Sequence, residues 1–327
     1  MPVIKQKVKS RRATYRRPQK IDRNLSIQDY AAKRNKVLIF RGCGGLGDIM
    51  MHRMMFEDIK LLMPDAEIHF SCPHQYHDAV KDHPYVDRIL TVDEVNRNDY
   101  LISYNTTTAC GRYEMKISPL SDKHRSDIWA NHCGFNLTKH NMHIKLTEEE
   151  KREGKEILER ERNRSGPIVL ICPISAMQNK NLLGNHLNDS INHLIEKNCC
   201  PIGLHNTPVP EMVRKNHPVI YGLKLRQWMS VMNEADYVVS VDTAHLHCAG
   251  GLNKPMVGIF TFVNASTYCK YYPNCIQVQG PCPANQAGCY NWGACPLTKL
   301  NPKPCLSELA SKRILSGIDE MMEKFPI

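Results

Sequence analysis

Short apolar runs alternate with longer segments of helical periodicity from Lys36 onward. Apolar runs bounded by turn residues are typical of buried strands, and amphipathic segments between them are typical of helices. The runs predict strands at 37–40, 66–70, 86–90, 100–104, 142–146, 167–173, 200–205, 218–222, 236–241 and 255–260. The segments between them predict helices at 48–63, 74–82, 122–133, 147–164, 186–197, 208–216, 224–234, 244–251 and 306–324, with an irregular Cys/Pro-rich stretch before the last.

This alternation predicts an α/β fold whose parallel sheets are covered by helices on both faces. Thr147 and Glu150 form a capping box at the start of the charged helix. The pattern restarts at Ser165-Gly166-Pro167, so we expect two such units joined near residue 165. Ligands of such folds bind at the carboxyl ends of the strands, here in the cleft between the units.

The net charge of +10 is concentrated at the N-terminus. Residues 1–36 carry twelve Lys and Arg against two Asp, whereas the rest of the chain has 31 basic and 31 acidic residues. The body is therefore not a basic nucleic-acid-binding domain. The basic segment 5–36 could still neutralise phosphates of a nucleic acid or an anionic membrane. The alternative is a disordered tail over 1–35 with no specific partner.

No apolar run is long enough to span a membrane, and no apolar stretch follows the basic N-terminus as in a secretory signal. We therefore expect a cytoplasmic protein, with peripheral membrane contact left open. Fourteen cysteines suit that compartment as thiols or metal ligands. Eight are scattered, often inside apolar runs as Cys172 and Cys248 are, and we expect these to be small buried hydrophobic residues.

The segment GCGGLG at 42–47 matches the dinucleotide-binding pattern G-x-G-x-x-G. A dinucleotide fold also needs an acidic residue at the end of its second strand, where this chain has Phe70-Ser71-Cys72. The glycines could instead give a substrate access to Asp48, which follows them. Asp48 is then either a helix-start carboxylate stabilised by the helix dipole, which the segment alone favours, or a general base.

The second unit contains a candidate anion site. Asp242-Thr243-Ala244 follows a predicted strand and begins a short helix, whose free backbone N–H groups would suit a diphosphate. Ser175 and Lys180, in the loop after the strand at 167–173, could reach the same phosphates, or form an ordinary polar loop. For His245 and His247, packing is the alternative to a functional role, and a His-x-His metal pair lacks a third ligand nearby.

Three segments in this order resemble glycosyltransferase family 9, the heptosyltransferase-like enzymes. RGCGGLGDIM (41–50) is similar to the family motif that ends in G-D-[IVL]-[LM], and PISAMQNKN (173–181) to its P-x-[ST] loop with a following lysine. ADYVVSVDTAHLHCAGGLNKPMVGIF (235–260) is similar to the family's A-x-x-V-V-x-x-D-[ST]-G-L-x-H segment and the strand after it. The likeness runs from about residue 36 to residue 325 and is most specific in the third segment.

The resemblance implies a GT-B architecture of two Rossmann-like domains facing across a cleft. The acceptor domain would span 36–164, the nucleotide-sugar domain 165–305 with a Cys-rich loop at 269–305, and a C-terminal helix 306–327. It implies an inverting glycosyltransferase that uses a nucleotide diphosphate-sugar and requires no cofactor for catalysis. The acceptor would be a glycan of the lipopolysaccharide kind or a lipid-linked one.

The resemblance also implies residue roles. Asp48 matches the position of the family's general base. Leu223 would lie in the base pocket, and Ser175 would help to bind phosphate. Lys180 and the backbone of Thr243, Ala244 and His245 would stabilise the leaving diphosphate, and Asp242 with His247 would hold that loop in shape. These donor positions are Gly47, Ser175, Lys180, Leu223, Asp242, Thr243, Ala244, His245 and His247.

Three positions depart from the family pattern. Ala244 stands where the family has a glycine, the tryptophan common after the lysine loop is absent at Asn181-Leu182, and His205-Asn206 replaces the acidic residue expected near the donor ribose. The donor's base and sugar therefore stay open. A glycosyltransferase that acts on modified bases in DNA and a non-catalytic nucleotide-sugar-binding protein are the alternatives.

Six cysteines fall within 269–305, and the last four have the spacing C-x6-C-x5-C-x9-C. Thiolates gathered on a loop with few core residues suggest a structural zinc, although the C-x2-C of familiar zinc sites is absent. Thiols packed in a loop over the cleft are an equal alternative. The candidate zinc ligands are Cys282, Cys289, Cys295 and Cys305.

Overall fold

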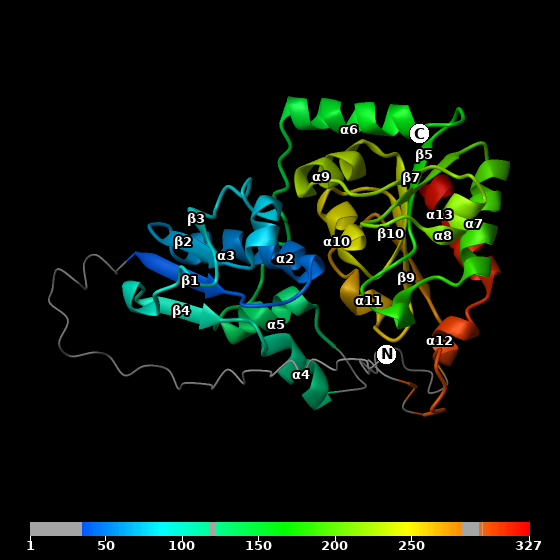
Figure 1. Ribbon diagram of the computed structural model, residues 1–327. Helices are drawn as coiled ribbons and strands as arrows, with labels where there is room; N and C mark the ends of the chain where they lie inside the picture. The colour runs from blue at the N-terminus through cyan, green and yellow to red at the C-terminus, as the bar shows by residue number, and fades with distance from the viewer. Residues whose placement is uncertain (1–34, 118–121, 283–293, 296) are drawn as a thin grey trace, which may run out of the picture.

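The computed structural model of the protein describes residues 35–117, 122–282, 294–295 and 297–327. It contains two parallel β-sheets, one from each half of the chain, with helices packed on them (Figure 1). The α/β class with parallel sheets, predicted from the strand–helix alternation, is confirmed.

The first sheet has four strands in the order β3-β2-β1-β4, all parallel to their neighbours. The strands are β1 (Lys36–Phe40), β2 (Glu67–Ser71), β3 (Arg88–Leu90) and β4 (Ile102–Asn105). The helices and 3₁₀ turns of this half are α2 (Leu46–His52), η1 (Arg53–Met55), α3 (Phe56–Leu62), η2 (His74–Ala79), η3 (Arg97–Asp99), α4 (Ala109–Ile117) and α5 (Arg125–His132).

The second sheet has six parallel strands in the order β10-β9-β8-β5-β6-β7. They are β5 (Ile168–Cys172), β6 (Cys200–Leu204), β7 (Val219–Ile220), β8 (Tyr237–Val241), β9 (Met256–Phe260) and β10 (Cys275–Gln279). The helical elements are α6 (Glu148–Glu161), η4 (Gln178–Lys180), α7 (Gly184–Glu196), α8 (Pro210–Arg214), α9 (Leu225–Glu234), α10 (Ala244–Gly251), α11 (Ala265–Tyr268), α12 (Pro304–Ser307) and α13 (Ser311–Lys324). The strand order reverses between β5 and β8, and ligands of open α/β sheets bind at such a point.

Several elements differ from the sequence-based expectation. The helix expected over 48–63 contains the 3₁₀ turn η1, the helix expected over 74–82 is the 3₁₀ turn η2, and the helix expected over 306–324 is divided into α12 and α13. The stretch expected to be irregular contains β10, in which Ile276 and Val278 are buried while Gln277 is exposed. Its apolar residues alternate with polar ones, as in an edge strand with one buried face, and do not form a continuous apolar run.

The strand predicted at 142–146 is wrong, because side chains satisfy the backbone of this segment in place of a neighbouring strand. Arg53 donates to the carbonyl oxygens of Met142 and His143, both at 2.7 Å. Arg226 donates to the carbonyl oxygen of Lys145 at 2.6 Å. Buried backbone groups need such partners, and here guanidinium groups supply them.

Buried ion pairs join the two halves beside this segment. Arg53, with no exposed side-chain surface, donates to both carboxylate oxygens of Asp82 at 3.0 Å. Asp82 also pairs with Arg226 of the second half at 3.0 Å, and Arg226 binds Glu150 through two hydrogen bonds of 2.7 Å. Removing one partner of a buried pair leaves an uncompensated charge and costs about 3–5 kcal/mol. The cluster therefore fixes how the halves meet.

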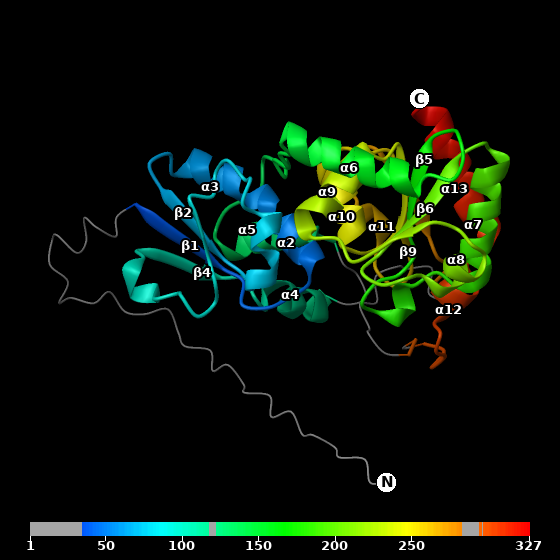
Figure 2. The same cartoon turned by 45° about the horizontal axis from the view of Figure 1, so that its top comes forward.

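One hydrophobic cluster also crosses the interface between the halves. It contains Ile49 and Trp129 from the first half and Leu246 and Met232 from the second, all fully buried. A second cluster lies on the other face of the large sheet, where α7 and α13 lie side by side (Figure 2). None of the helices in the described part of the chain combines the length and apolar character needed to cross a bilayer.

The domain limits given above stay a prediction. Within the expected acceptor unit, α6 packs against α9 of the second half (Figure 1). Of the expected tail over 1–35, only Asn35 lies within the described residues. The proposed nucleic-acid or membrane contact of segment 5–36 therefore falls almost wholly outside them.

The contact between α6 and α9 depends on a glycine. A Cβ atom at Gly154 would lie 2.6 Å from the backbone carbon of Ser230. Because backbone cannot yield as a flexible side chain can, we expect Gly154→Ala to lower the free energy of unfolding by about 1–3 kcal/mol in urea titrations. The matched control is Gly111→Ala on α4, where no atom lies within 4 Å and a gain of about 0.5–1 kcal/mol is expected. Equal effects of the two variants would contradict this account.

Candidate active site

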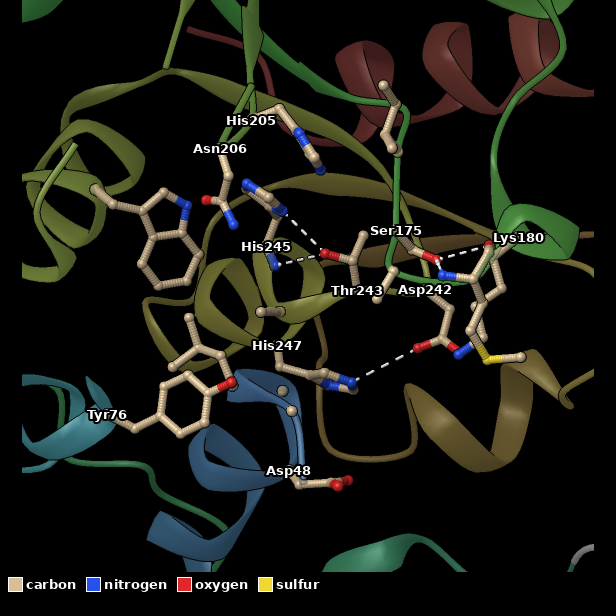
Figure 3. Close-up of a pocket in the computed structure, with 18 of the residues that line it drawn as sticks. Asp48, Tyr76, Ser175, Lys180, His205, Asn206, Asp242, Thr243, His245 and His247 are labelled. Carbon is tan, nitrogen blue, oxygen red and sulfur yellow. Dashed lines mark hydrogen bonds and ion pairs between the residues drawn. The ribbon is translucent and has the colours of Figure 1, made fainter. Parts of the chain in front are cut away.

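A cavity of about 560 Å³ lies between the two halves, and all ten catalytic and donor-binding residues predicted from the sequence line it. Figure 3 shows Asp48, from α2, on one side of the cavity, and Asp242, Thr243 and His245, from the start of α10, on the other. The predicted lining residues are Gly47, Asp48, Ser175, Lys180, Leu223, Asp242, Thr243, Ala244, His245 and His247.

The first turns of α2 and α10 touch at Gly47. A Cβ atom at Gly47 would lie 3.0 Å from Cδ2 of His247 and 3.6 Å from the backbone nitrogen of Ala244. Both helices therefore begin at the same cavity, and their N-terminal backbone groups share it. A Cβ atom at this position would press on the His247 ring, so Gly47 allows the two helices to approach closely. The dinucleotide pattern would instead place these glycines against a pyrophosphate.

Asp48 is held by two arginines. Arg41 donates to Oδ2 at 2.5 Å and Arg125 donates to Oδ1 at 2.8 Å, while 13% of the Asp48 side chain stays exposed. Burial alone would raise the pKa of this carboxyl, but the charges of Arg125 and Arg41 outweigh it and lower the pKa below its ordinary value of 3.8. Asp48 is therefore an anion at neutral pH, in a fixed orientation, with one edge open to the cavity.

His52 contacts the same turn of α2 through the backbone of Asp48. Its Nδ1 lies 2.7 Å from the carbonyl oxygen of Asp48, and its Nε2 lies 2.9 Å from Oγ1 of Thr106. Its ring lies against that of Trp129, with centroids 3.7 Å apart and the ring planes tilted by 33°. Burial, reinforced by the charge of Arg41, lowers the pKa of His52 to about 3. The imidazole is therefore neutral at physiological pH.

The start of α10 combines a cap with an ion pair. Thr243 is the N-cap residue, and its Oγ1 accepts from the backbone N–H of His245 at 3.2 Å. Asp242 pairs with Lys180 at 2.6 Å, and Nε2 of His247 lies 3.7 Å from its other oxygen. Burial would raise the pKa of Asp242, but Lys180 and His247 hold it below its ordinary value. The Lys180 ammonium is thus fixed beside the start of α10, where it and the backbone N–H of Ala244 can attract an anion.

Ser175 lies in the loop that carries Lys180. Its hydroxyl donates to the carbonyl oxygen of Met177 and accepts from the backbone N–H of Met177, both at 3.0 Å, and its backbone N–H donates to Asn181 at 2.7 Å. In this structure the hydroxyl orders its own loop, and its predicted contact with phosphate stays a prediction. Leu223 lies on the cavity wall, and its place in a base pocket stays a prediction.

The model of glycosyltransferase family 9 (heptosyltransferase) matches residues 123–287, half of the chain. The chain belongs to glycosyltransferase family 9. The matched range includes the second and third sequence motifs and begins after the first, which contains Asp48. The expected family is therefore confirmed, and the protein is a glycosyltransferase that uses a nucleotide-sugar.

Solved structures of family 9 enzymes show the same fold. A glycosyltransferase family 9 protein of Veillonella parvula is 13% identical over 89% of this chain and 98% of its own, with a TM-score of 0.69. The ADP-heptose lipopolysaccharide heptosyltransferase II of Escherichia coli is 13% identical over 88% and 99%, with a TM-score of 0.61. The iron-containing glycosyltransferase TibC of enterotoxigenic E. coli is 14% identical over 89% and 77%, with a TM-score of 0.66. These likenesses confirm the GT-B fold, whereas the curated proteins contain no match.

Sequence reasoning missed several residues of this family 9 cavity. Trp228, Tyr76, Arg125 and Tyr268 line it, and the ring of Trp228 meets that of His245 edge-on with centroids 5.4 Å apart. Trp228, Tyr76 and Arg125 lie inside predicted helices, and Tyr268 lies in the stretch expected to be irregular. No local pattern distinguishes any of them from an ordinary packing residue. Only the arrangement of the two halves brings them to the site.

The four proposed zinc ligands lie only partly within the described residues. Cys295 and Cys305 are buried, Cys282 is half-buried, and Cys289 lies outside the described residues. Within 35–117, 122–282, 294–295 and 297–327, no group of three or more His, Cys, Asp or Glu side chains is arranged to hold a metal ion. The zinc site stays a prediction.

The buried imidazoles make stability depend on pH. Burial lowers the pKa of His245 to about 3, as for His52, against an ordinary value of 6.5. Below pH 6.5 the unfolded chain binds more protons than the folded one, so stability is complete above that pH and is lost as the pH falls toward 3. Each group contributes about 1.4 kcal/mol per pH unit in this window. Urea titrations from pH 7.5 to 5 should show this loss, and His245→Leu should reduce its slope; a flat profile in the parent protein would contradict it.

Proposed function

We propose that this family 9 enzyme transfers a sugar, with inversion, from a nucleotide diphosphate-sugar to a hydroxyl group of a glycan or lipid-linked acceptor. One observation carries the proposal. The Asp48 carboxylate, fixed and partly exposed, lies on one side of the cavity. The helix start at Thr243 and the ammonium of Lys180 lie on the other side. A base on one side and an anion site on the other are what a direct displacement needs.

In this mechanism Asp48 acts as the general base. The oxygen of the acceptor hydroxyl attacks the anomeric carbon of the donor, and its proton passes to Asp48. The bond between that carbon and the diphosphate oxygen breaks, and its electron pair leaves with the diphosphate. Attack and departure on opposite faces invert the anomeric carbon.

The start of α10 and Lys180 stabilise the charge that develops on the diphosphate. Ala244 is the first residue of a helix that begins at the cavity, and we expect its backbone N–H to donate to the diphosphate. Preorganised donors of this kind act where charge develops in the transition state, and removing one typically costs about 10²- to 10³-fold in kcat. Asp242 keeps the Lys180 ammonium at this place.

Related structures support a nucleoside diphosphate donor. The heptosyltransferase WaaC of E. coli has been solved with ADP and with ADP-2-deoxy-2-fluoro heptose, and TibC with ADP-D-β-D-heptose. Heptosyltransferase II of E. coli is named for lipopolysaccharide, which supports an acceptor of the glycan class. His205 and Asn206 line the cavity beside Leu204, where the resemblance predicts contact with the donor ribose. None of these three residues carries a carboxylate.

A thermal-shift screen of ADP, GDP, UDP and CDP identifies the nucleoside that the cavity accepts. The matching nucleotide-sugars, with ADP-D-β-D-heptose first, are then assayed for release of the nucleoside diphosphate with glycan acceptors. Proton NMR of the product gives the anomeric configuration. Retention would contradict the direct displacement, and binding without turnover would favour a non-catalytic nucleotide-sugar-binding protein.

We expect Asp48→Asn to lower kcat by about 10²- to 10⁴-fold, because an amide cannot accept the hydroxyl proton. Affinity for the nucleoside diphosphate, measured by titration calorimetry, should stay within about twofold, since the predicted diphosphate contacts come from the second half. The matched control is Asp65→Asn, at an exposed position outside the cavity. Normal turnover by Asp48→Asn would exclude Asp48 as the base.

We expect Lys180→Met to weaken binding of both the nucleoside diphosphate and inorganic pyrophosphate by at least about tenfold. The variant removes the ammonium, worth about 1.5–3 kcal/mol as a charged hydrogen-bond donor, and leaves Asp242 as an uncompensated anion beside the site. Lys215→Met, at an exposed position on the second half, is the control. Unchanged pyrophosphate affinity would place the diphosphate elsewhere.

A further inference from the structure

Asp48 belongs to a chain of four charged groups that continues away from the cavity. Arg41 and Arg125 bind its two oxygens, and Arg125 also binds Glu114 on α4. Arg125 donates from Nε to Oε1 of Glu114 at 2.7 Å and from Nη2 to Oε2 at 2.9 Å. Glu114 is only 4% exposed. Glutamates are rarely buried to this extent unless they are paired with another group.

The geometry of these bonds fixes the Asp48 carboxylate. A guanidinium group is planar and rigid, so two bonds to Glu114 determine the direction in which Nη1 of Arg125 points. That nitrogen donates to Oδ1 of Asp48 at 2.8 Å. With Arg41 on the other oxygen, the plane of the carboxylate is set from both sides.

The charges of the chain alternate and cancel. Two arginines facing Asp48 alone would leave one positive charge without compensation in a buried place, and Glu114 supplies the second negative charge. The balance matters most when Asp48 takes up a proton and becomes neutral. Arg125 then still has Glu114 as its partner, so protonation of Asp48 leaves only Arg41 without a carboxylate in this chain. Glu114 therefore reduces the cost of protonating Asp48.

The second half of the molecule contacts the same chain through α11. The hydroxyl of Tyr268 donates to Oε1 of Glu114 at 3.3 Å, and the Arg125 guanidinium lies 5.6 Å from the centre of the Tyr268 ring. Tyr268 also lines the cavity. The support of Asp48 is therefore completed by a residue from the half that carries the anion site.

We propose that Glu114 and Arg125 are a positioning pair that sets the orientation and the basicity of Asp48, and that Tyr268 joins this pair to the second half. The inference rests on the proposed role of Asp48 as the base. Neither Glu114 nor Tyr268 exchanges a proton with the substrates, because their part is to act through Arg125.

A double-mutant cycle tests the pair. The variants are Glu114→Gln, Arg125→Gln and the two combined, assayed by ADP release from ADP-D-β-D-heptose, or from the nucleotide-sugar that the screen selects. Glu114→Gln should lower kcat roughly 10- to 100-fold, as expected when a catalytic group is misplaced. The KM for the nucleotide-sugar and the affinity for ADP should change less than about twofold. Adding Glu114→Gln to Arg125→Gln should cause no further loss, because the residue through which it acts is already gone.

The matched control is Glu149→Gln, an exposed glutamate on α6 that should retain full kcat. The melting temperature and the ADP affinity of every variant are measured to establish that its fold and its cavity are intact. A merely structural Glu114 would cause the same loss with and without Arg125, and that additive result would overturn the proposal. Full kcat in Glu114→Gln alongside an inactive Asp48→Asn would overturn it while leaving the proposed function intact. Full turnover by Asp48→Asn, or no turnover of any nucleotide-sugar by the parent protein, would overturn both.

Discussion

The contact between the first turns of α2 and α10 is the constraint on which the site depends. At Gly47 the two helices approach so closely that a methyl group would press on the ring of His247. Two helix starts therefore open onto one cavity, and each brings its positive dipole end to it. Asp48 neutralises the first, and an anionic ligand would neutralise the second. In the proposed function, the carboxylate at one helix start lies on the acceptor side of the cavity, and the anion site at the other lies on the donor side.

Buried charge keeps this arrangement in place at both levels of the structure. Asp82 lies between Arg53 and Arg226 and so joins the halves, while Glu114 and Arg125 hold the carboxylate inside the cavity. Each of these arrangements includes one pair between distant parts of the chain, Asp82 with Arg226 and Asp48 with Arg125. Such pairs contribute little to stability when compared with an apolar core, but they define one geometry, because a small shift would leave a charge unpaired.

The sequence predicted most of what local chemistry determines. The strands of the second sheet that are buried on both faces, such as β5 and β8, appear as apolar runs, and the strand–turn–helix around Thr243 carries its own cap. The prediction of a strand at 142–146 is wrong because its alternating apolar and polar residues resemble a half-buried strand. The carbonyl oxygen of Met142 accepts instead from Arg53, which lies 89 residues earlier in the chain. Arg125 and Glu114 were missed for the same reason, since a charged residue on a helix shows no sign of its partner until the chain has folded.

The continuous core between the halves has a consequence for how the enzyme exchanges its substrates. Rotating the halves apart would expose Ile49 and Leu246 to water and pull Asp82 away from Arg226. Each such step costs free energy, because apolar surface is exposed to water and the contact between Asp82 and Arg226 is lost. Local rearrangements at the rim of the cavity, as around the exposed Asn206, require no such loss. The contacts between the halves therefore favour substrate exchange by local movement at the cavity rim over rotation of the two halves.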